Sequence, residues 1–106
     1  MERYIAIAAQ MVVDRQLESS RVPPRTRHRH LEAAGIAANV MLRAGPRAVD
    51  RKAILREANE QQNVFEEVGA SDVDAAVSIL QNHWLEVEEL ATEFTKRVKR
   101  RQFNAA

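Results

Sequence analysis

The feature that most constrains the fold is a series of apolar residues near the C-terminus, spaced alternately four and three positions apart. Residues with this spacing lie along one side of an α-helix, and a long series is typical of helices that pack lengthwise against a partner helix. The series consists of Val73, Val77, Leu80, Trp84, Val87, Ala91, Phe94 and Val98. No Gly or Pro interrupts residues 71–103. We therefore predict one long helix with a coiled-coil pattern, opening with the capping sequence Ser71-Asp72-Val73-Asp74.

The composition also favours a helical fold in one domain. The chain has 106 residues, of which 45% are hydrophobic but only 5% aromatic, and Ala is the most frequent apolar residue. A β-sheet would draw more heavily on β-branched and aromatic residues. Because this length fits one domain, we predict a single all-α domain over residues 1–106.

The residue content excludes several classes of protein. The chain contains no Cys, which excludes a disulfide scaffold, a Cys-ligated zinc site and a thiol nucleophile. No apolar run approaches the ~18 residues that a membrane-spanning helix needs. The sequence after Met1-Glu2-Arg3 lacks the pattern of a signal peptide. We therefore expect a cytoplasmic protein without membrane contact.

Two further helices are predicted in the first half of the chain. The first covers about residues 2–19 and ends before Val22-Pro23-Pro24, because neither proline can donate a backbone hydrogen bond. The second runs from Thr26, a candidate N-cap, to about residue 42, where Gly45-Pro46 stops it.

A third helix is predicted from about residue 47 to residue 68, with Gly69 as the left-handed residue that follows a helix end. Phe65 belongs to its apolar face. The short connection 68–71 would place this helix antiparallel to the long C-terminal one. The expected architecture is thus an antiparallel four-helix bundle dominated by its last two helices.

Charge is distributed very unevenly along the chain, although the formal net charge is only +1. Residues 57–93 contain ten acidic residues and no Lys or Arg, so all 16 basic residues lie outside this segment. Acidic side chains held together repel one another unless cations neutralise them. We therefore expect the basic first two helices to pack against the acidic segment in the same or another chain, through Arg15, Arg21, Arg25, Arg27, Arg43 and Arg47.

No arrangement in the sequence is typical of catalysis or cofactor binding. His28 and His30 are two positions apart and point in different directions on a helix, and His83 has only Glu86 as a possible second ligand at helical spacing. The glycines are isolated and no serine lies in a nucleophile elbow. We therefore predict a protein that is not an enzyme, with no catalytic, cofactor-binding or metal-binding residues.

Two basic clusters, at residues 21–30 and 96–101, allow an alternative function. Together they could contact a phosphate backbone, which would make the protein a small nucleic-acid-binding regulator. Against this, no aromatic residue is interleaved as a stacking platform, and cations at a helix C-terminus also offset its dipole. The candidate contact residues are Arg25, Arg27, Arg29, Lys96, Lys99 and Arg100.

A family resemblance covers residues 31–98. The segment Gly69-Ala70-Ser71-Asp72-Val73-Asp74-Ala75-Ala76-Val77-Ser78-Ile79 resembles the helix after the active-site helix in FtsH-like zinc peptidases, and segments 31–39 and 83–91 are similar to two other helices of that domain. The resemblance implies that Asp72 lies one residue short of the third zinc ligand. The HExxH motif, with two zinc ligands and the general base, is missing. The resemblance therefore implies a non-catalytic relative.

The predicted function is a helical protein–protein interaction module: an adaptor, inhibitor or regulator of bacterial or mobile-element origin. A long C-terminal helix would extend beyond its shorter neighbour and leave Phe94, Val98 and Phe103 in water, although the first helix could fold back over them. We therefore predict a homodimer. Its expected interface residues are Val77, Leu80, Trp84, Val87, Phe94 and Val98.

Overall fold

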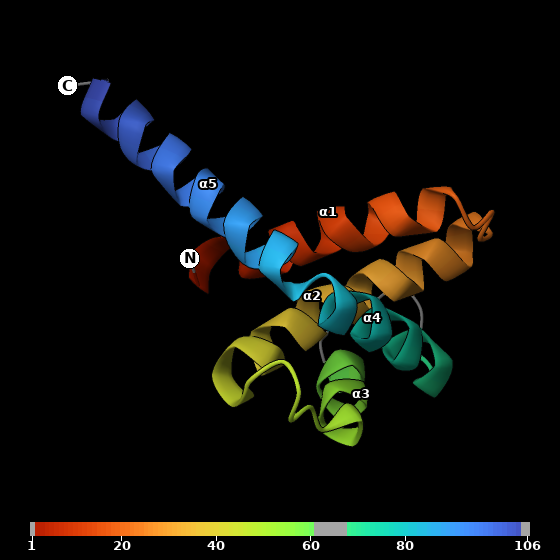
Figure 1. The fold of residues 1–106 in the computed structure, drawn as a ribbon. Helices are drawn as coiled ribbons and strands as arrows, with labels where there is room; N and C mark the ends of the chain where they lie inside the picture. Colours follow the sequence, from red (N-terminus) through yellow and green to blue (C-terminus); the bar gives the residue numbers. More distant parts are fainter. Residues whose placement is uncertain (1, 61–67, 105–106) are drawn as a thin grey trace.

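The computed structural model describes residues 2–60 and 68–104, in which every regular element is a helix (Figure 1). This confirms the all-α class. A short 3-10 helix, η1 (Glu2–Tyr4), leads into α1 (Ile5–Glu18), which is followed by α2 (Pro24–Ala44), α3 (Arg51–Glu60), α4 (Ala70–Asn82) and α5 (Trp84–Asn104). In the described ranges, no helix combines the length and the apolar character needed to cross a membrane.

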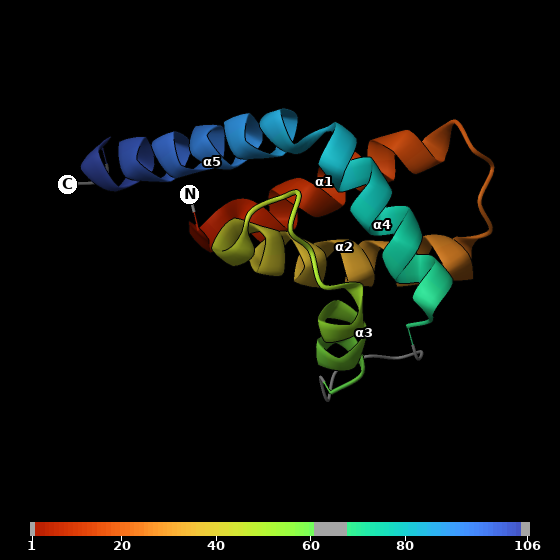
Figure 2. The ribbon, with the colours of Figure 1, turned by 60° about the horizontal axis from the view of Figure 1, so that its bottom comes forward.

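The centre of the fold is the antiparallel pair of α1 and α2, which make the most extensive contact between any two elements (Figure 2). Small side chains let the two backbones approach closely, because Ala8 and Ala9 of α1 and Ala34 and Ala37 of α2 are all fully buried. The prediction that the third and fourth helices dominate the fold is therefore wrong. The run of Ala residues in α2 indicates this close packing better than the apolar repeat does.

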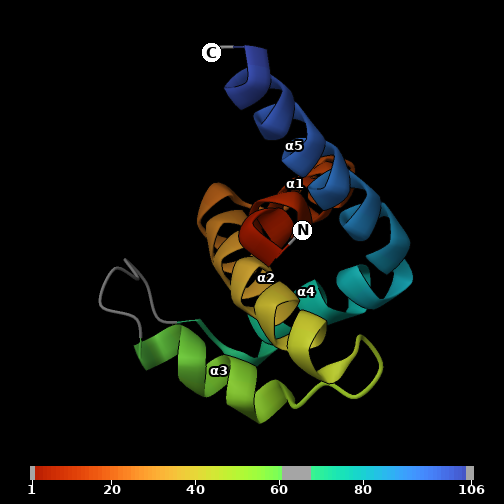
Figure 3. The ribbon, with the colours of Figure 1, turned by 90° about the vertical axis from the view of Figure 1, so that its left-hand side faces the viewer.

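The predicted long C-terminal helix is in fact two helices joined at His83, so the four-helix bundle is not confirmed. His83 leaves the helical conformation, with φ −123° and ψ 20°, and its N–H is shared between the carbonyls of Ile79 and Leu80. The apolar repeat continues through the bend but serves two surfaces, since α4 packs mainly on α2 while α5 packs on α1 and η1 (Figure 3). A straight helix would carry Val87 and Ala91, both fully buried here, away from the core.

The bounds of α2 and α3 are set by different residues from those expected. α2 begins at Pro24 with Pro23 as N-cap, so Thr26 lies in the first turn and is not the cap. Proline fits this position because it has no N–H to leave unpaired. α3 begins at Arg51, not residue 47, because Asp50 Oδ1 accepts the N–H groups of Lys52 (3.0 Å) and Ala53 (3.2 Å).

The connection between α3 and α4 also differs from the prediction. α3 ends at Glu60, and the rest of the predicted third helix up to residue 67, including Phe65, lies outside the described residues. Gly69 has φ −92° and is the N-cap of α4, so it is not a left-handed residue after a helix. The side-chain amide of Asn59 donates to the Val68 carbonyl and its oxygen accepts the Val68 N–H, both at 3.0 Å. These two bonds tie the end of α3 to the start of α4.

Candidate interaction surface

Four of the six predicted interface residues are not on the surface. Val77, Leu80 and Val87 are fully buried and Trp84 nearly so, all within the core of the chain itself. The apolar repeat that suggested a contact between two chains is mostly used within one chain. Only Phe94 and Val98, both of intermediate exposure, remain available to a partner.

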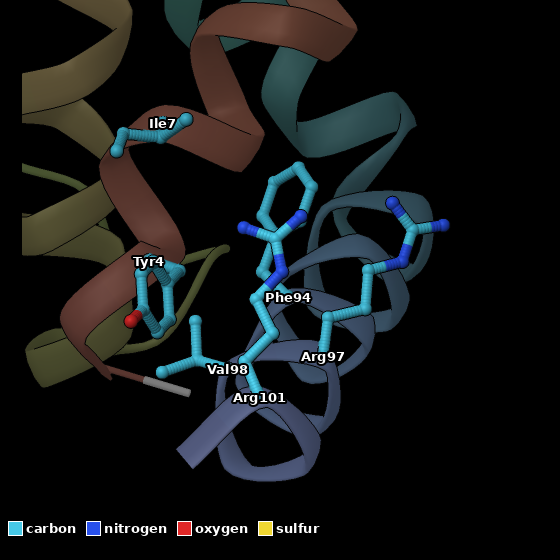
Figure 4. Close-up of a pocket in the computed structure, with 6 residues that line it drawn as sticks. All are labelled: Tyr4, Ile7, Phe94, Arg97, Val98 and Arg101. Atoms are coloured by element: carbon cyan, nitrogen blue, oxygen red, sulfur yellow. The ribbon is translucent and has the colours of Figure 1, made fainter. Parts of the chain in front are cut away.

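Phe94 and Val98 line an open pocket of about 300 Å³ between the start of the chain and the second half of α5. Tyr4 and Ile7 form the opposite wall (Figure 4). The rings of Tyr4 and Phe94 meet edge to face, with centroids 6.3 Å apart and an interplanar angle of 68°. This geometry is favourable for aromatic pairs. The first helix therefore does fold back over part of the surface that was expected to be exposed.

Two arginines of α5, Arg97 and Arg101, complete the lining of this pocket. Arg101 extends back along the pocket toward Phe94, whereas Arg97 points away from α1 (Figure 4). Both residues are exposed. The pocket thus combines apolar walls with a positively charged rim.

The apolar character continues along α1 beyond the pocket. Ile7 is 51% exposed and Met11, one helical turn further on, is 43% exposed. Isolated exposed apolar residues are common on protein surfaces, but these two are neighbours on one helix face beside a pocket. The described part of the chain has one other large, exposed apolar residue, Leu85, at the start of α5.

A second hollow, of about 310 Å³, lies further along the boundary between α1 and α5. Leu90 and Val12 contribute its apolar part, and Arg15 lies on the α1 side. The α5 side carries acidic residues: Glu86, Glu89 and Glu93. Together the two hollows form what we call the α1–α5 groove, acidic at one end and basic at the other.

The two basic clusters do not form one surface. The first is at the start of α2 and the second is at the end of α5, at opposite ends of the molecule (Figures 1 and 2). In the first cluster, Arg27 Nε donates to Asp14 Oδ1 and its Nη2 lies 3.4 Å from Glu18 Oε1. The hydrogen bond to Asp14 raises the pKa of Arg27 above its ordinary value. Lys96, Lys99 and Arg100 of the second cluster are exposed.

Arg29 and His30 meet a buried carboxylate. Asp72 is 4% exposed, with Oδ1 2.8 Å from His30 Nδ1 and Oδ2 3.3 Å from Arg29 Nε. The Gly69 N–H donates to Oδ2 at 2.9 Å, which is one half of a capping box. The His30 contact has ion-pair distance but is not aligned as a hydrogen bond. This cluster joins α2 to the start of α4.

This Asp72 cluster was not predicted from the sequence. His30 was considered as part of the first basic cluster and as a possible metal ligand. Asp72 was considered as part of the acidic segment, of the capping sequence and of the peptidase resemblance, but the two residues were not paired. The sequence feature that could have indicated the cluster is the basic pair Arg29-His30, because it lies on a helix that was expected to pack against the acidic segment. Among the described residues, no group of three or more His, Asp or Glu side chains is placed to hold a metal ion.

The expected packing of basic helices against the acidic segment is observed in part. α2 packs extensively against α4, and Arg43 Nη2 lies 3.7 Å from Glu57 Oε2. Arg27, by contrast, pairs with acidic residues of α1, outside the acidic segment. Arg29, which lies 3.3 Å from Asp72 of the acidic segment, was not among the arginines expected to pair there.

Comparisons with protein-family models, with curated proteins and with solved structures found no match for this chain.

Proposed function

We propose that this protein is a non-enzymatic interaction module that binds a helical segment of a protein in the α1–α5 groove. The observation that carries this proposal is the group formed by half-exposed Ile7 and Met11 beside the pocket of Tyr4, Phe94 and Val98. Burying these side chains against a partner would remove apolar surface from water, which is the main favourable contribution to protein association.

The shape and the chemistry of the groove both favour a helical partner. The groove follows two helices, and a third helix with an apolar stripe can lie along such a surface. The aromatic pair Tyr4 and Phe94 and the arginines Arg97 and Arg101 are residue types that often dominate binding energy at interfaces. The charges on the rim would then set the orientation of the bound helix.

A second candidate function is nucleic-acid binding by the end of α5 alone. It is favoured by the exposed basic residues Lys96, Lys99 and Arg100, with no acidic residue after Glu93. A salt titration of duplex DNA binding tests it, since each phosphate contact contributes about −0.9 to the slope of log K against log salt. We expect the protein not to bind duplex DNA even at low salt. Binding with a steep slope of log K against log salt, made less steep by Lys99→Glu, would favour this second candidate.

The proposed function is tested by placing a photo-crosslinking amino acid at Ile7, in an extract of the organism that encodes the protein. A matched control places the same amino acid at Lys52, which is exposed on α3, on the far side of α2 from α5 (Figure 3). We expect a defined crosslinked protein at position 7 and none at position 52. Equal crosslinking at both positions, or none at position 7, would contradict the proposal.

A further inference from the structure

Four charged residues of α5 form a line along the rim of the α1–α5 groove. Glu89, Glu93, Arg97 and Arg101 are each four positions apart, so they follow one ridge of the helix surface, and all four are exposed. We call them the α5 charge row. Within the chain, Arg97 Nε lies 3.4 Å from Glu93 Oε1, and this pair is open to solvent.

When two copies of this row are placed antiparallel, each charge faces a charge of the opposite sign. Read toward the C-terminus the row is negative, negative, positive, positive, and the midpoint lies between Glu93 and Arg97. If a second α5 approaches antiparallel about a two-fold axis at this midpoint, Glu93 faces Arg97 of the partner subunit. Glu89 then faces Arg101 of the partner subunit. Each of these contacts occurs twice, as two-fold symmetry requires.

The apolar part of the groove lies beside the row. Arg97 and Arg101 line the pocket formed by Tyr4, Ile7 and Val98, and Glu89 and Glu93 line the second hollow. A helix that pairs with the charge row is therefore placed against the exposed apolar side chains as well. Charge pairing sets the register, and apolar contact supplies the favourable free energy.

We propose that the partner in the groove is a second copy of this chain, with the two α5 helices antiparallel and their charge rows paired. This inference rests on the proposed function, because it names the occupant of the same groove. The self-complementary order of the row is what favours a second copy over an unrelated helix. An unrelated partner would not require this order to be symmetric about a midpoint.

The experiment is a charge-swap series measured by sedimentation over a concentration series from micromolar upward. Glu93→Arg places like charges at both central contacts of a homodimer, and Arg97→Glu does the same with the opposite sign. The wild type should form a dimer of twice 12.0 kDa. Each single variant should dimerise about tenfold more weakly or worse, because like charges are brought together twice.

Two combinations should restore association. An equal mixture of the Glu93→Arg and Arg97→Glu chains should form a mixed dimer, since each central contact is again between opposite charges. The double variant Glu93→Arg, Arg97→Glu should dimerise by itself for the same reason. The matched controls are Glu60→Arg and Lys52→Glu, which make the same charge changes at exposed positions of α3 and should dimerise as the wild type does.

The outcomes separate this inference from the proposed function. A monomeric wild type that still gives a crosslink at position 7 to a different protein overturns the self-association and leaves the proposed function in place. No crosslink at position 7 and no dimer overturn both. A wild-type dimer that neither single variant weakens, with both variants folded by circular dichroism, overturns the charge-row pairing.

Discussion

The carboxylate of Asp72 on α4 lies 2.8 Å from the imidazole Nδ1 of His30 on α2, and both side chains are almost entirely removed from solvent. Arg29 reaches the other oxygen of the same carboxylate, and the Gly69 N–H caps it. One acidic residue thus both starts α4 and fixes that helix to α2. The position of α5, and with it one wall of the groove, depends on α4.

We expect Asp72→Asn to destabilise the fold by about 2–3 kcal/mol, because it leaves Arg29 and His30 facing a neutral group in a nearly buried site. The matched control is Asp74→Asn, two positions further along α4 at an exposed position, where the carboxylate makes only a solvent-exposed pair with Arg51 of α3. Urea unfolding followed by circular dichroism measures both changes. If Asp72→Asn lowers the free energy of unfolding no more than Asp74→Asn does, the cluster does not hold α2 and α4 together.

The close approach of α1 and α2 is tested at Gly35. A Cβ at this position would lie 3.0 Å from Gln10 Nε2, which donates to the Leu31 carbonyl at 3.1 Å. Gly35→Ala gains about 1 kcal/mol of helix propensity but displaces this amide, so we expect little net change. In a Gln10→Ala background the same substitution should stabilise by about 0.5–1 kcal/mol. Thermal unfolding measures the stability of all four variants. If Gly35→Ala stabilises the wild type more than it stabilises the Gln10→Ala background, the Gln10 side chain is not what restricts a larger residue at position 35.

A substitution at Leu80 tests whether this residue belongs to the core of one chain or to an interface between two chains. It is 0% exposed, so Leu80→Ala should cost about 2–5 kcal/mol of unfolding free energy. The cost should be the same at low and high protein concentration, because the lost contacts lie within one chain. Denaturation at several concentrations measures this. A loss that appears only at concentrations where the chain is associated would restore Leu80 to an interface.

The helical class and several element ends could be predicted from the sequence because they depend on local physics. The Pro23-Pro24 break separates α1 from α2, and Gly45, whose φ of 92° favours glycine, follows the last residue of α2. The bend at His83 could not be predicted, since no Gly or Pro marks it and the apolar repeat runs through it unchanged. It arises from packing α4 and α5 on different helices.

Of the residues of the candidate surface, only Phe94 and Val98, the members of the apolar repeat that are not buried, were predicted from the sequence. The repeat alone does not tell a contact within the chain from a contact between chains, so Val77 and Val87 were assigned to an interface although they are buried. Phe94 and Val98 keep intermediate exposure and line the pocket opposite Tyr4 of η1 and Ile7 of α1. The other wall of the groove, with Ile7 and Arg15, depends on how α1 crosses α5, which no local pattern specifies.

The most direct test of the groove as a docking surface uses the methionine methyl groups as reporters. Met11 is 43% exposed on α1, one turn from Ile7 of the groove, whereas Met41 is fully buried in the core and serves as an internal control. The measurement is the 13C-methyl NMR spectrum of the wild-type chain, recorded from dilute to concentrated samples. We predict that the Met11 signal shifts with association while the Met41 signal stays in place. Association that leaves the Met11 signal unchanged would contradict the proposal that a second copy of this chain binds in the α1–α5 groove.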